Sequence, residues 1–311
     1  MNPTPASLDA FFLGLASNFW QGYSSAPIFW NKIAMLQPST SSATLQGWMD
    51  KLPIMRKWVG SRVVNSPQAH KYRIENDAYE QTLAIEKWVL QDDEHGLYAP
   101  VAQMMGVQAS KWPDRMLRDL LAENAGDGPI CWDQLSFFNT AHPIDISGIV
   151  PGTFSNKLTL PLTPDNYQSA RATMMTFKGA DGETMATMPT VLVVPPELEL
   201  TARNFLNASF IAPITVGGNA QAGANQNVLL GSADLVVIPE LSPISQTRWY
   251  LLAGGMPIKP FIFQQRQAPF FVYKNRPEDE SMFWNHQMVV GAEARGAVGV
   301  SLPQLAIASQ P

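Results

Sequence analysis

The segment from residue 61 to 90 places the tightest limit on the fold of this chain. It reads as two long strands on either side of a turn at residues 75–78. Residues 62–64 and 72–74 lead into the turn, and residues 79–89, with partial alternation of apolar and polar side chains, lead out of it. An isolated two-stranded hairpin is only marginally stable in water. If this hairpin projects from the body, we expect another subunit to hold it.

An amphipathic helix is expected near the N-terminus. Ser7 is suited to cap its start and Gly22 to close its end. Large apolar side chains recur between them at helical spacing: Leu8, Phe11, Phe12, Leu15 and Phe19. The small, polar residues 37–47 predict an extended connector. The helix must bury its phenylalanine stripe, and two places remain open for this, the body of its own chain and a neighbouring subunit.

The middle and C-terminal parts of the sequence predict a mixture of helices and strands. A helical stretch runs from about residue 97 to 124, and Pro113 should kink or split it, because proline lacks the backbone donor of a helix interior. Thr163-Pro164-Asp165 is a strong start for a helix that reaches residue 178. One more helix is expected at 195–208, and strands at 190–194, 228–230, 235–238, 249–252, 260–264, 270–274 and 282–293. The predicted fold class is α+β.

Charged residues are sparse for a chain of 311 residues. Asp, Glu, Lys and Arg make up 15% of it, against about 25% in ordinary soluble domains. Part of the surface must then be neutral or apolar, and such surface commonly contacts a partner protein. The nine tryptophans indicate the same, because tryptophan is enriched at protein interfaces. Composition fits a neutral protein with a tryptophan-rich core equally well. The net charge of −5 argues against binding nucleic acid by neutralising its phosphates.

The sequence also bears on the compartment. The single cysteine, Cys131, excludes a disulfide within the chain and fits a reducing environment. The first 31 residues contain neither Lys nor Arg, so no secretory signal is expected. The longest uncharged run, 204–233, is too rich in Asn, Gln and Gly for a membrane span. We expect a soluble protein made in a cytoplasm, with no membrane partner.

Motifs for catalysis or metal binding are nearly absent. The sequence has no phosphate-binding loop, no His-Glu-x-x-His and no paired-cysteine spacing, so we expect no cofactor and no metal site. His142, with Asp145 three residues later, is the best candidate for a general base, although a structural histidine is the simpler interpretation. Cys131 has no basic neighbour and should be buried and inert. The acidic cluster 92–94 should be solvated. The chain is not expected to be an enzyme.

Several short motifs in the first half resemble one family. They are Thr4-Pro5-Ala6-Ser7-Leu8, Ile33-Ala34, Pro38-Ser39-Thr40, Gly47-Trp48, Pro53, Trp58-Val59-Gly60, Arg62-Val63-Val64, Gln68-Ala69-His70, Tyr72-Arg73-Ile74, Asp92-Asp93, Gly96-Leu97-Tyr98-Ala99-Pro100, Phe137-Phe138 and His142-Pro143. Through them, roughly the first 145 residues resemble the major head (capsid) subunit of Mu-like tailed bacteriophages and prophages. Residues 190–208 are expected to form a strand, a Pro-Pro-Glu turn and a helix. This element is similar to one in many phage capsid subunits, so it identifies the family less specifically than the motifs of the first half.

The resemblance implies a shell-forming subunit with the fold named after phage Hong Kong 97. Its parts would be an N-terminal arm (1–60), an extended hairpin loop (61–95), a spine helix with the first part of the peripheral domain (96–164), an axial domain (165–255) and the second part of the peripheral domain (256–311). Such subunits form pentamers and hexamers, work with scaffold, head maturation protease and portal proteins, and enclose double-stranded DNA without sequence-specific binding. The resemblance places the protein in the virion, after assembly in the host cytoplasm.

This plan makes the apolar residues of the arm and hairpin candidates for contacts between subunits. They are Phe11, Phe12, Leu15, Phe19, Tyr72, Ile74 and Tyr79. Two alternatives stay open, an encapsulin-like compartment shell of the same fold around a protein cargo and a soluble hydrolase that uses His142 with a carboxylate. The first differs from a phage head in its contents, and the second in forming no large assembly.

Overall fold

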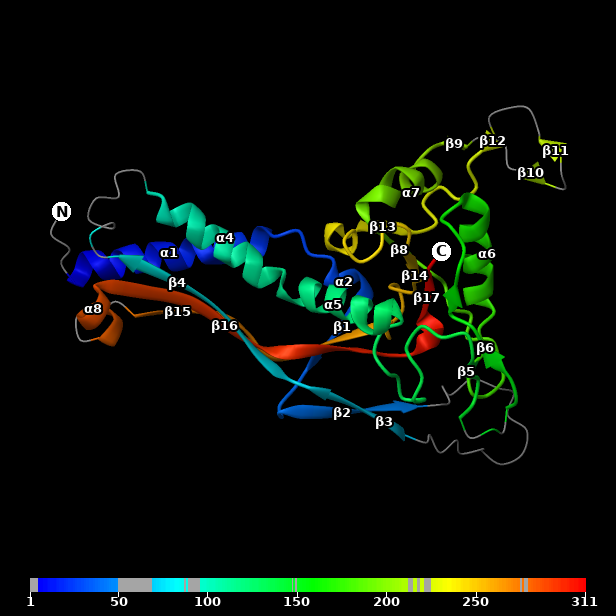
Figure 1. Ribbon diagram of the computed structural model, residues 1–311, viewed down its shortest axis with the longest axis horizontal. Helices are drawn as coiled ribbons and strands as arrows, with labels where there is room; N and C mark the ends of the chain where they lie inside the picture. The colour runs from blue at the N-terminus through cyan, green and yellow to red at the C-terminus, as the bar shows by residue number, and fades with distance from the viewer. Residues whose placement is uncertain are drawn as a thin grey trace.

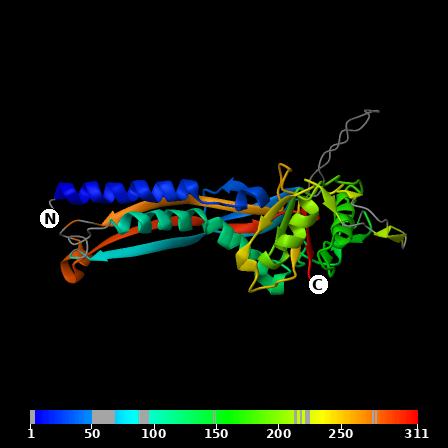
Figure 2. The same cartoon turned by 90° about the horizontal axis from the view of Figure 1, so that it is seen from above.

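The chain forms two units arranged along one long axis (Figure 1). The computed structural model describes residues 5–49, 69–86, 88, 96–146, 148, 150–211, 215–216, 219–220, 225–274, 276 and 279–311. The long unit contains a four-stranded sheet, and the short unit contains a five-stranded sheet. The described chain begins at the far end of the long unit, and the C-terminus lies in the short unit (Figure 2).

The helices and strands have the following bounds. The helices are α1 (Pro5–Ser25), α2 (Trp30–Ile33), α4 (Tyr98–Ser110), α5 (Trp112–Gly126), α6 (Pro164–Met175), α7 (Glu199–Leu206) and α8 (Glu280–Asn285), with 3-10 turns η1 (Pro196–Leu198), η2 (Pro239–Leu241) and η3 (Pro303–Leu305). The strands are β1 (Ala34–Pro38), β2 (Ala43–Met49), β3 (Ala69–Glu75), β4 (Asp77–Glu86), β5 (His142–Pro143), β6 (Thr153–Phe154), β7 (Lys157–Leu158), β8 (Val191–Val194), β9 (Phe210–Ile211), β10 (Thr215–Val216), β11 (Asn219–Ala220), β12 (Asn225–Gln226), β13 (Asp234–Val237), β14 (Trp249–Leu252), β15 (Phe261–Lys274), β16 (Gln287–Val300) and β17 (Ala306–Ser309).

The long unit is built on a sheet with the strand order β1-β15-β16-β4. β15 and β16, each of 14 residues, pair antiparallel along most of their length, and β1 pairs parallel to β15. α1 and α4 lie side by side and pack on this sheet, where Phe12 and Leu15 share a core with Met288 and Val290 of β16. Figure 2 shows α1 running along the long axis beside these strands.

The long helix is divided as Pro113 predicts. α4 ends at Ser110 and α5 begins at Trp112, with Lys111 between them and the proline in the first turn of α5. A proline is tolerated there because the first amides of a helix have no partner within the helix. The second predicted helix start is also confirmed, since the Thr163 side chain accepts a hydrogen bond from the amide of Asn166 at 3.2 Å.

The short unit is a sheet covered on both faces. Its strand order is β13-β8-β14-β17-β7, and every residue of β8, β14 and β17 is buried. Side chains of a strand alternate between its faces. Val193 therefore packs with α5 residues such as Leu117, whereas Leu192 packs with Tyr167 of α6 and Phe205 of α7.

The hairpin expected within residues 61–95 is wrong in the pairing of its described strands, and its lead-in residues 62–64 lie outside the described residues. β3 pairs with β2 over seven residues, from Ala43 opposite Glu75 to Met49 opposite Ala69. β4 instead joins the long sheet, pairing antiparallel with β16. The hairpin is thus made of β2 and β3, and the segment 37–47, expected to be a connector in the arm, supplies part of it. Alternation predicts a strand but not its partner, because several strands offer a matching face.

The C-terminal segment is also divided between the two units. β15 and β16 belong to the long sheet, whereas β17 inserts between β14 and β7 of the short sheet. The expectation that 256–311 lies wholly in one domain is therefore wrong for its last strand. Because β17 is buried at all four positions, the end of the described chain is part of the short unit's core.

Candidate assembly surfaces

The phenylalanine stripe of α1 is buried within its own chain. Phe12 and Phe19 are fully buried, and Leu15 is 3% exposed. Phe12 stacks on Tyr273 of β15, with ring centroids 5.2 Å apart. The sequence left open whether the stripe packs on its own chain or on a neighbouring subunit, and the structure shows that it packs on its own chain. These three side chains therefore have no surface left for a neighbour. Phe11 is half-buried and packs edge-on against Phe12.

Two glycines bring α1 and α4 into direct backbone contact. A Cβ placed on Gly106 of α4 would lie 1.9 Å from the carbonyl oxygen of Phe19, and one on Gly22 of α1 would lie 1.9 Å from that of Gln103. Neither position has room for any side chain. This close approach fixes α1 on the subunit as a rigid element instead of leaving it as a free arm.

The outward faces of this helix pair are apolar and nearly without charge. Across the 21 residues of α1 and the 13 of α4, the only charged side chain is Asp9. Leu13 and Trp20 of α1 are 62% and 43% exposed, and Val101 and Met104 of α4 are 40% and 57% exposed. We call these four residues the helix-pair face. Exposed apolar surface is typical of sites of association, so the helix-pair face is a candidate contact surface.

The β2–β3 hairpin is anchored at its base. Ile74 is 3% exposed and packs with Ile262 and Ala297 of the long sheet, so it is not available to a neighbour. Tyr72 is half-buried, and burial, followed by the nearby Cys131 and Glu123, raises the pKa of its hydroxyl to about 12. These two predicted contact residues fix the hairpin to its own subunit.

Apolar surface is exposed on the other strand of the hairpin, where Leu45 lies opposite Arg73, and beside the hairpin. Leu45 of β2 is 59% exposed, and Tyr79 of β4 is 37% exposed. The Tyr79 ring lies 5.2 Å from that of Trp112, and burial, with the charges of Asp77 and Asp119, raises the pKa of its hydroxyl. Of the seven predicted contact residues, Phe11, Tyr72 and Tyr79 therefore keep accessible surface.

His142 is a buried structural residue in the described chain. Its side chain is fully buried, Nδ1 lies 2.5 Å from Oδ2 of Asp133, and Nε2 lies 3.1 Å from the carbonyl oxygen of Phe137. The nearby acid is Asp133, not the expected Asp145, which accepts a hydrogen bond from the amide of Val150. Since a general base must reach its substrate, this ring is not placed for catalysis.

The other chemical candidates give no site in the described residues. Cys131 is 2% exposed, and burial, with the charge of Asp133, raises the pKa of its thiol, as expected for an inert cysteine. The acidic cluster 92–94 lies outside the described residues. No group of three or more His, Cys, Asp or Glu side chains in the described ranges is placed to hold a metal ion. Within the same ranges, no helix has both the length and the apolar character to cross a membrane.

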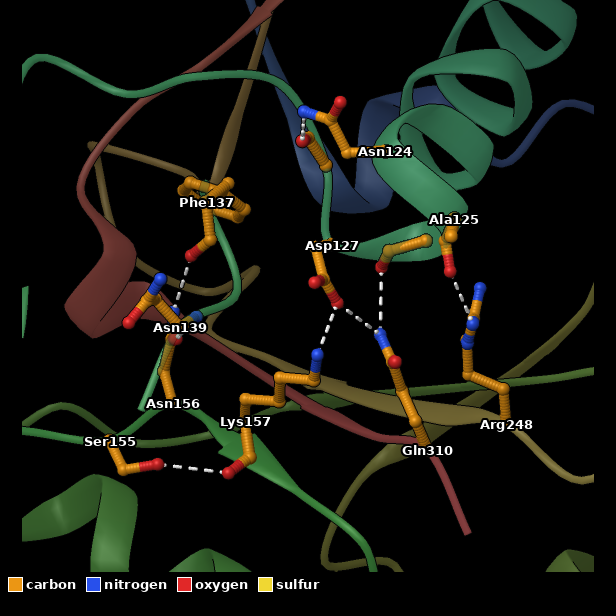
Figure 3. A network of polar contacts seen from close by, with 12 residues as sticks. Asn124, Ala125, Asp127, Phe137, Asn139, Ser155, Asn156, Lys157, Arg248 and Gln310 are labelled. Atoms are coloured by element: carbon orange, nitrogen blue, oxygen red, sulfur yellow. Dashed lines mark hydrogen bonds and ion pairs between the residues drawn. The ribbon is translucent and has the colours of Figure 1, made fainter. Parts of the chain in front are cut away.

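A polar network joins the end of α5 to the short sheet (Figure 3). Residues 124–126 all have positive φ angles, which non-glycine residues rarely adopt. Arg248 donates to the carbonyl oxygen at position 125 over 2.8 Å, and Gln310 to that at position 126 over 2.9 Å. Lys157 and Asp127 form an ion pair of 2.6 Å beside them. These contacts set the direction in which the long helix enters the short unit.

Solved structures with this arrangement are subunits of shells. The procapsid of bacteriophage JBD30 is 24% identical with a TM-score of 0.62, covering 99% of this chain and 76% of that one. The capsid of cyanophage P-SCSP1u is 9% identical with a TM-score of 0.57 (92% and 88% covered), and a virus-like particle from Pyrococcus furiosus is 10% identical with a TM-score of 0.53 (96% and 99% covered). The chain therefore has the fold of this class of shell subunits, the Hong Kong 97 type.

The sequence comparisons narrow this class to one family. The model described as "Mu-like prophage major head subunit gpT" matches residues 8–160, 157–241 and 240–311. The major capsid protein of Escherichia phage Mu is 27% identical over 98% of this chain and 74% of its own length. The Mu-like prophage FluMu major head subunit of Haemophilus influenzae is 24% identical over 98% and 73%. The chain belongs to the Mu-like prophage major head subunit family, and it is a major capsid protein that self-assembles into the virion shell.

Proposed function

We propose that this subunit forms pentamers and hexamers that close into an icosahedral head around double-stranded DNA, without a catalytic step of its own. Scaffold, head maturation protease and portal proteins are the partners that fit this role, and the host cytoplasm is the place of assembly. The proposal extends the family assignment, which by itself gives a self-assembling shell subunit. The observation that carries it is the combination of a rigid subunit with apolar surface that the subunit itself leaves uncovered.

The uncovered surface lies in places suited to different neighbours. The helix-pair face lies on the long unit, whereas Leu45 lies on the β2–β3 hairpin. A ring of identical subunits makes heterologous contacts, in which each surface meets a different surface on its neighbour. In this proposal, the long unit with its hairpin is the peripheral domain and the short unit is the axial domain. Contacts between subunits then involve the helix-pair face, Phe11 and Tyr79.

The charge of the chain fits a container for DNA. The net charge is −5, and a wall that repels phosphates weakly leaves the packed genome free to enter and leave, whereas a strongly basic wall would bind it. An encapsulin-like shell would hold protein cargo instead. The match to the head subunit family favours the phage head over that alternative.

The experiment that tests this function examines particles and their contents. The protein is purified alone and after co-expression with its neighbouring genes, and both samples are studied by sedimentation velocity and negative-stain electron microscopy. Closed shells, or rings of five and six, are the expected result, and nuclease-protected DNA is expected only when the packaging proteins are present. A monomer in both samples would contradict the proposal, and shells with protein cargo would favour the compartment.

A further inference from the structure

A cleft of about 490 Å3 lies at the junction of the two units. Its walls come from the connector between α1 and α2, from the start of α5, and from β13 with the turn η2 that follows it. In Figure 1, α2 and α5 lie together at this junction. The volume falls within the range of about 300–1,000 Å3 that ligand sites in proteins occupy. None of the assembly surfaces described above lines this cleft.

One wall of the cleft is the open edge of a sheet. β13 is the outermost strand of the five-stranded sheet, and among the described residues it pairs only with β8. The amides of Asp234 and Ile238 donate to the β8 side, to carbonyl oxygens 2.8 and 3.0 Å away. Because backbone groups of a strand alternate in direction, those of Leu235 and Val237 point away from β8, and both residues line the cleft. An exposed row of such groups is a template for another strand.

The opposite wall is basic. Lys111, Arg115 and Arg118 line it from the start of α5, and Lys32 from α2. Arg118 is paired with Asp119 at 2.6 Å, and Lys32 lies 3.8 Å from Asp234. Within the described part of the chain, neither Lys111 nor Arg115 forms an ion pair. These two cations are available to a carboxylate that enters the cleft.

The carboxylates of the cleft leave two of its cations without an ion pair. Asp114 is buried and accepts hydrogen bonds from the amides of Phe29 and Trp30, so it is occupied by the connector. Glu240 lies at the start of η2, beyond the strand edge. Asp234 and Asp119 pair with Lys32 and Arg118, so the cleft and its rim hold four cations and four carboxylates. Among the described residues, Lys111 and Arg115 are the two cations of the cleft without an ion pair, and they favour a negatively charged ligand.

We propose that this cleft binds an extended acidic peptide segment of a partner protein, which adds a strand to the edge of β13 and places its carboxylates against Lys111 and Arg115. The backbone groups of Leu235 and Val237 would pair with the peptide, and the alternate side chains of the peptide would face α5. A four-residue edge matches a peptide stretch of about 13 Å. Nucleic acid would use the cations but not the strand edge, so the geometry favours a peptide.

The test measures binding to unassembled full-length subunits by fluorescence anisotropy. The probe is a fluorescein-labelled octapeptide of alternating Thr and Glu. Two further probes are the same peptide with Lys in place of Glu and a version with alternate backbone amides methylated, which cannot pair with a strand edge. Arg115→Glu is the test variant, and Lys274→Glu, an exposed position on β15 away from the cleft, is the matched charge reversal. Thermal unfolding confirms that both variants are folded.

The acidic peptide should bind the natural sequence and Lys274→Glu equally. Arg115→Glu and backbone methylation should each weaken binding by about tenfold. Equal binding of the Lys peptide, or no loss with Arg115→Glu, would overturn the proposal. Binding of a 20-base-pair DNA duplex that depends on Arg115, together with no effect of methylation, would overturn it in favour of a phosphate site. Shell formation is scored separately, so failure of peptide binding leaves the proposed head function intact.

Discussion

Asp114, in the first turn of α5, accepts hydrogen bonds from the backbone amides of Trp30 at 2.8 Å and Phe29 at 3.2 Å, residues more than 80 positions earlier in the chain. This carboxylate ties the start of α2, and with it the connector from α1, to the long helix. Burial raises the pKa of Asp114 to about 6 and outweighs the two amide hydrogen bonds and Lys111, which lower it. The contact between the two segments is therefore sensitive to pH.

Asp114→Asn should flatten the dependence of stability on pH. Because the pKa is raised in the folded state, from an ordinary value of 3.8 to about 6, the folded chain binds this proton more tightly than the unfolded chain. The stabilisation that this proton provides is complete below about pH 4 and is lost as the pH rises through 6. The free energy of unfolding should fall over this range by an amount on the order of 2 kcal/mol. Urea unfolding from pH 4 to 7 measures it. Parallel profiles for the two proteins would contradict this assignment.

Gly106→Ala should separate α1 from α4. The new Cβ would lie 1.9 Å from the carbonyl oxygen of Phe19, so the helices must move apart, at a cost of about 1–3 kcal/mol or more. Gly14→Ala is the matched control, because nothing lies within 4 Å of its Cβ and alanine favours the helix. Chemical denaturation compares them. Equal stability of the two variants would refute the close packing.

Met104→Glu should impair assembly but leave the free subunit stable. Met104 is 57% exposed, and substitutions at such surface positions usually change stability by less than about 0.5 kcal/mol. If the helix-pair face is covered in the shell, the carboxylate must be desolvated without a partner. Sedimentation velocity measures the assembled fraction, and thermal unfolding measures the subunit. Normal shells from this variant would show that the face stays exposed after assembly.

Phe12→Ala should do the opposite and destabilise the subunit itself. Phe12 is fully buried between α1 and the long sheet and stacks on Tyr273, and truncating such a side chain removes about 3–5 kcal/mol. Chemical denaturation of unassembled subunits measures the loss. An unchanged free energy of unfolding, with assembly alone impaired, would mean that the helix docks on a neighbour.

His142→Ala should destabilise the short unit strongly. Both ring nitrogens face oxygen atoms, Nδ1 that of the Asp133 carboxylate and Nε2 that of the Phe137 carbonyl. Removing the ring leaves the buried carboxylate unpaired, which costs about 3–5 kcal/mol. The double variant with Asp133→Asn should recover part of the loss. If the double variant is no more stable than the single one, the pair does not interact as described.

Much of the local structure could be predicted from the sequence. The stripe that includes Phe12 and Phe19, the helix start at Thr163 and the split at Pro113 are local signals, because periodicity and capping involve residues within one or two turns. The strands at 190–194 and 249–252 were predictable for the same reason. The family resemblance added the class of fold, which the comparisons confirm.

The candidate sites were less predictable. The burial of Phe12, Leu15 and Phe19 in their own chain could not be read from their spacing, since a stripe that meets a neighbour has the same periodicity. The acid beside His142 turned out to be Asp133, nine positions earlier, instead of Asp145. The cleft had no sequence signal, because its walls come from segments that start near residues 27, 108 and 235.

The sequence by itself determined the approximate positions of most helices and strands, that the surface would carry little charge, and the family to which the chain belongs. Two expected strands are wrong in whole or in part, since residues 228–230 form a turn and α8 occupies the start of the strand expected at 282–293. Only the tertiary structure decided which strand pairs with which, so that β3 joins β2 while β4 joins β16. It also decided that β17 returns to the short sheet. The physical reason is that local order depends on neighbouring residues, whereas pairing and burial depend on a match of faces between segments far apart in the chain.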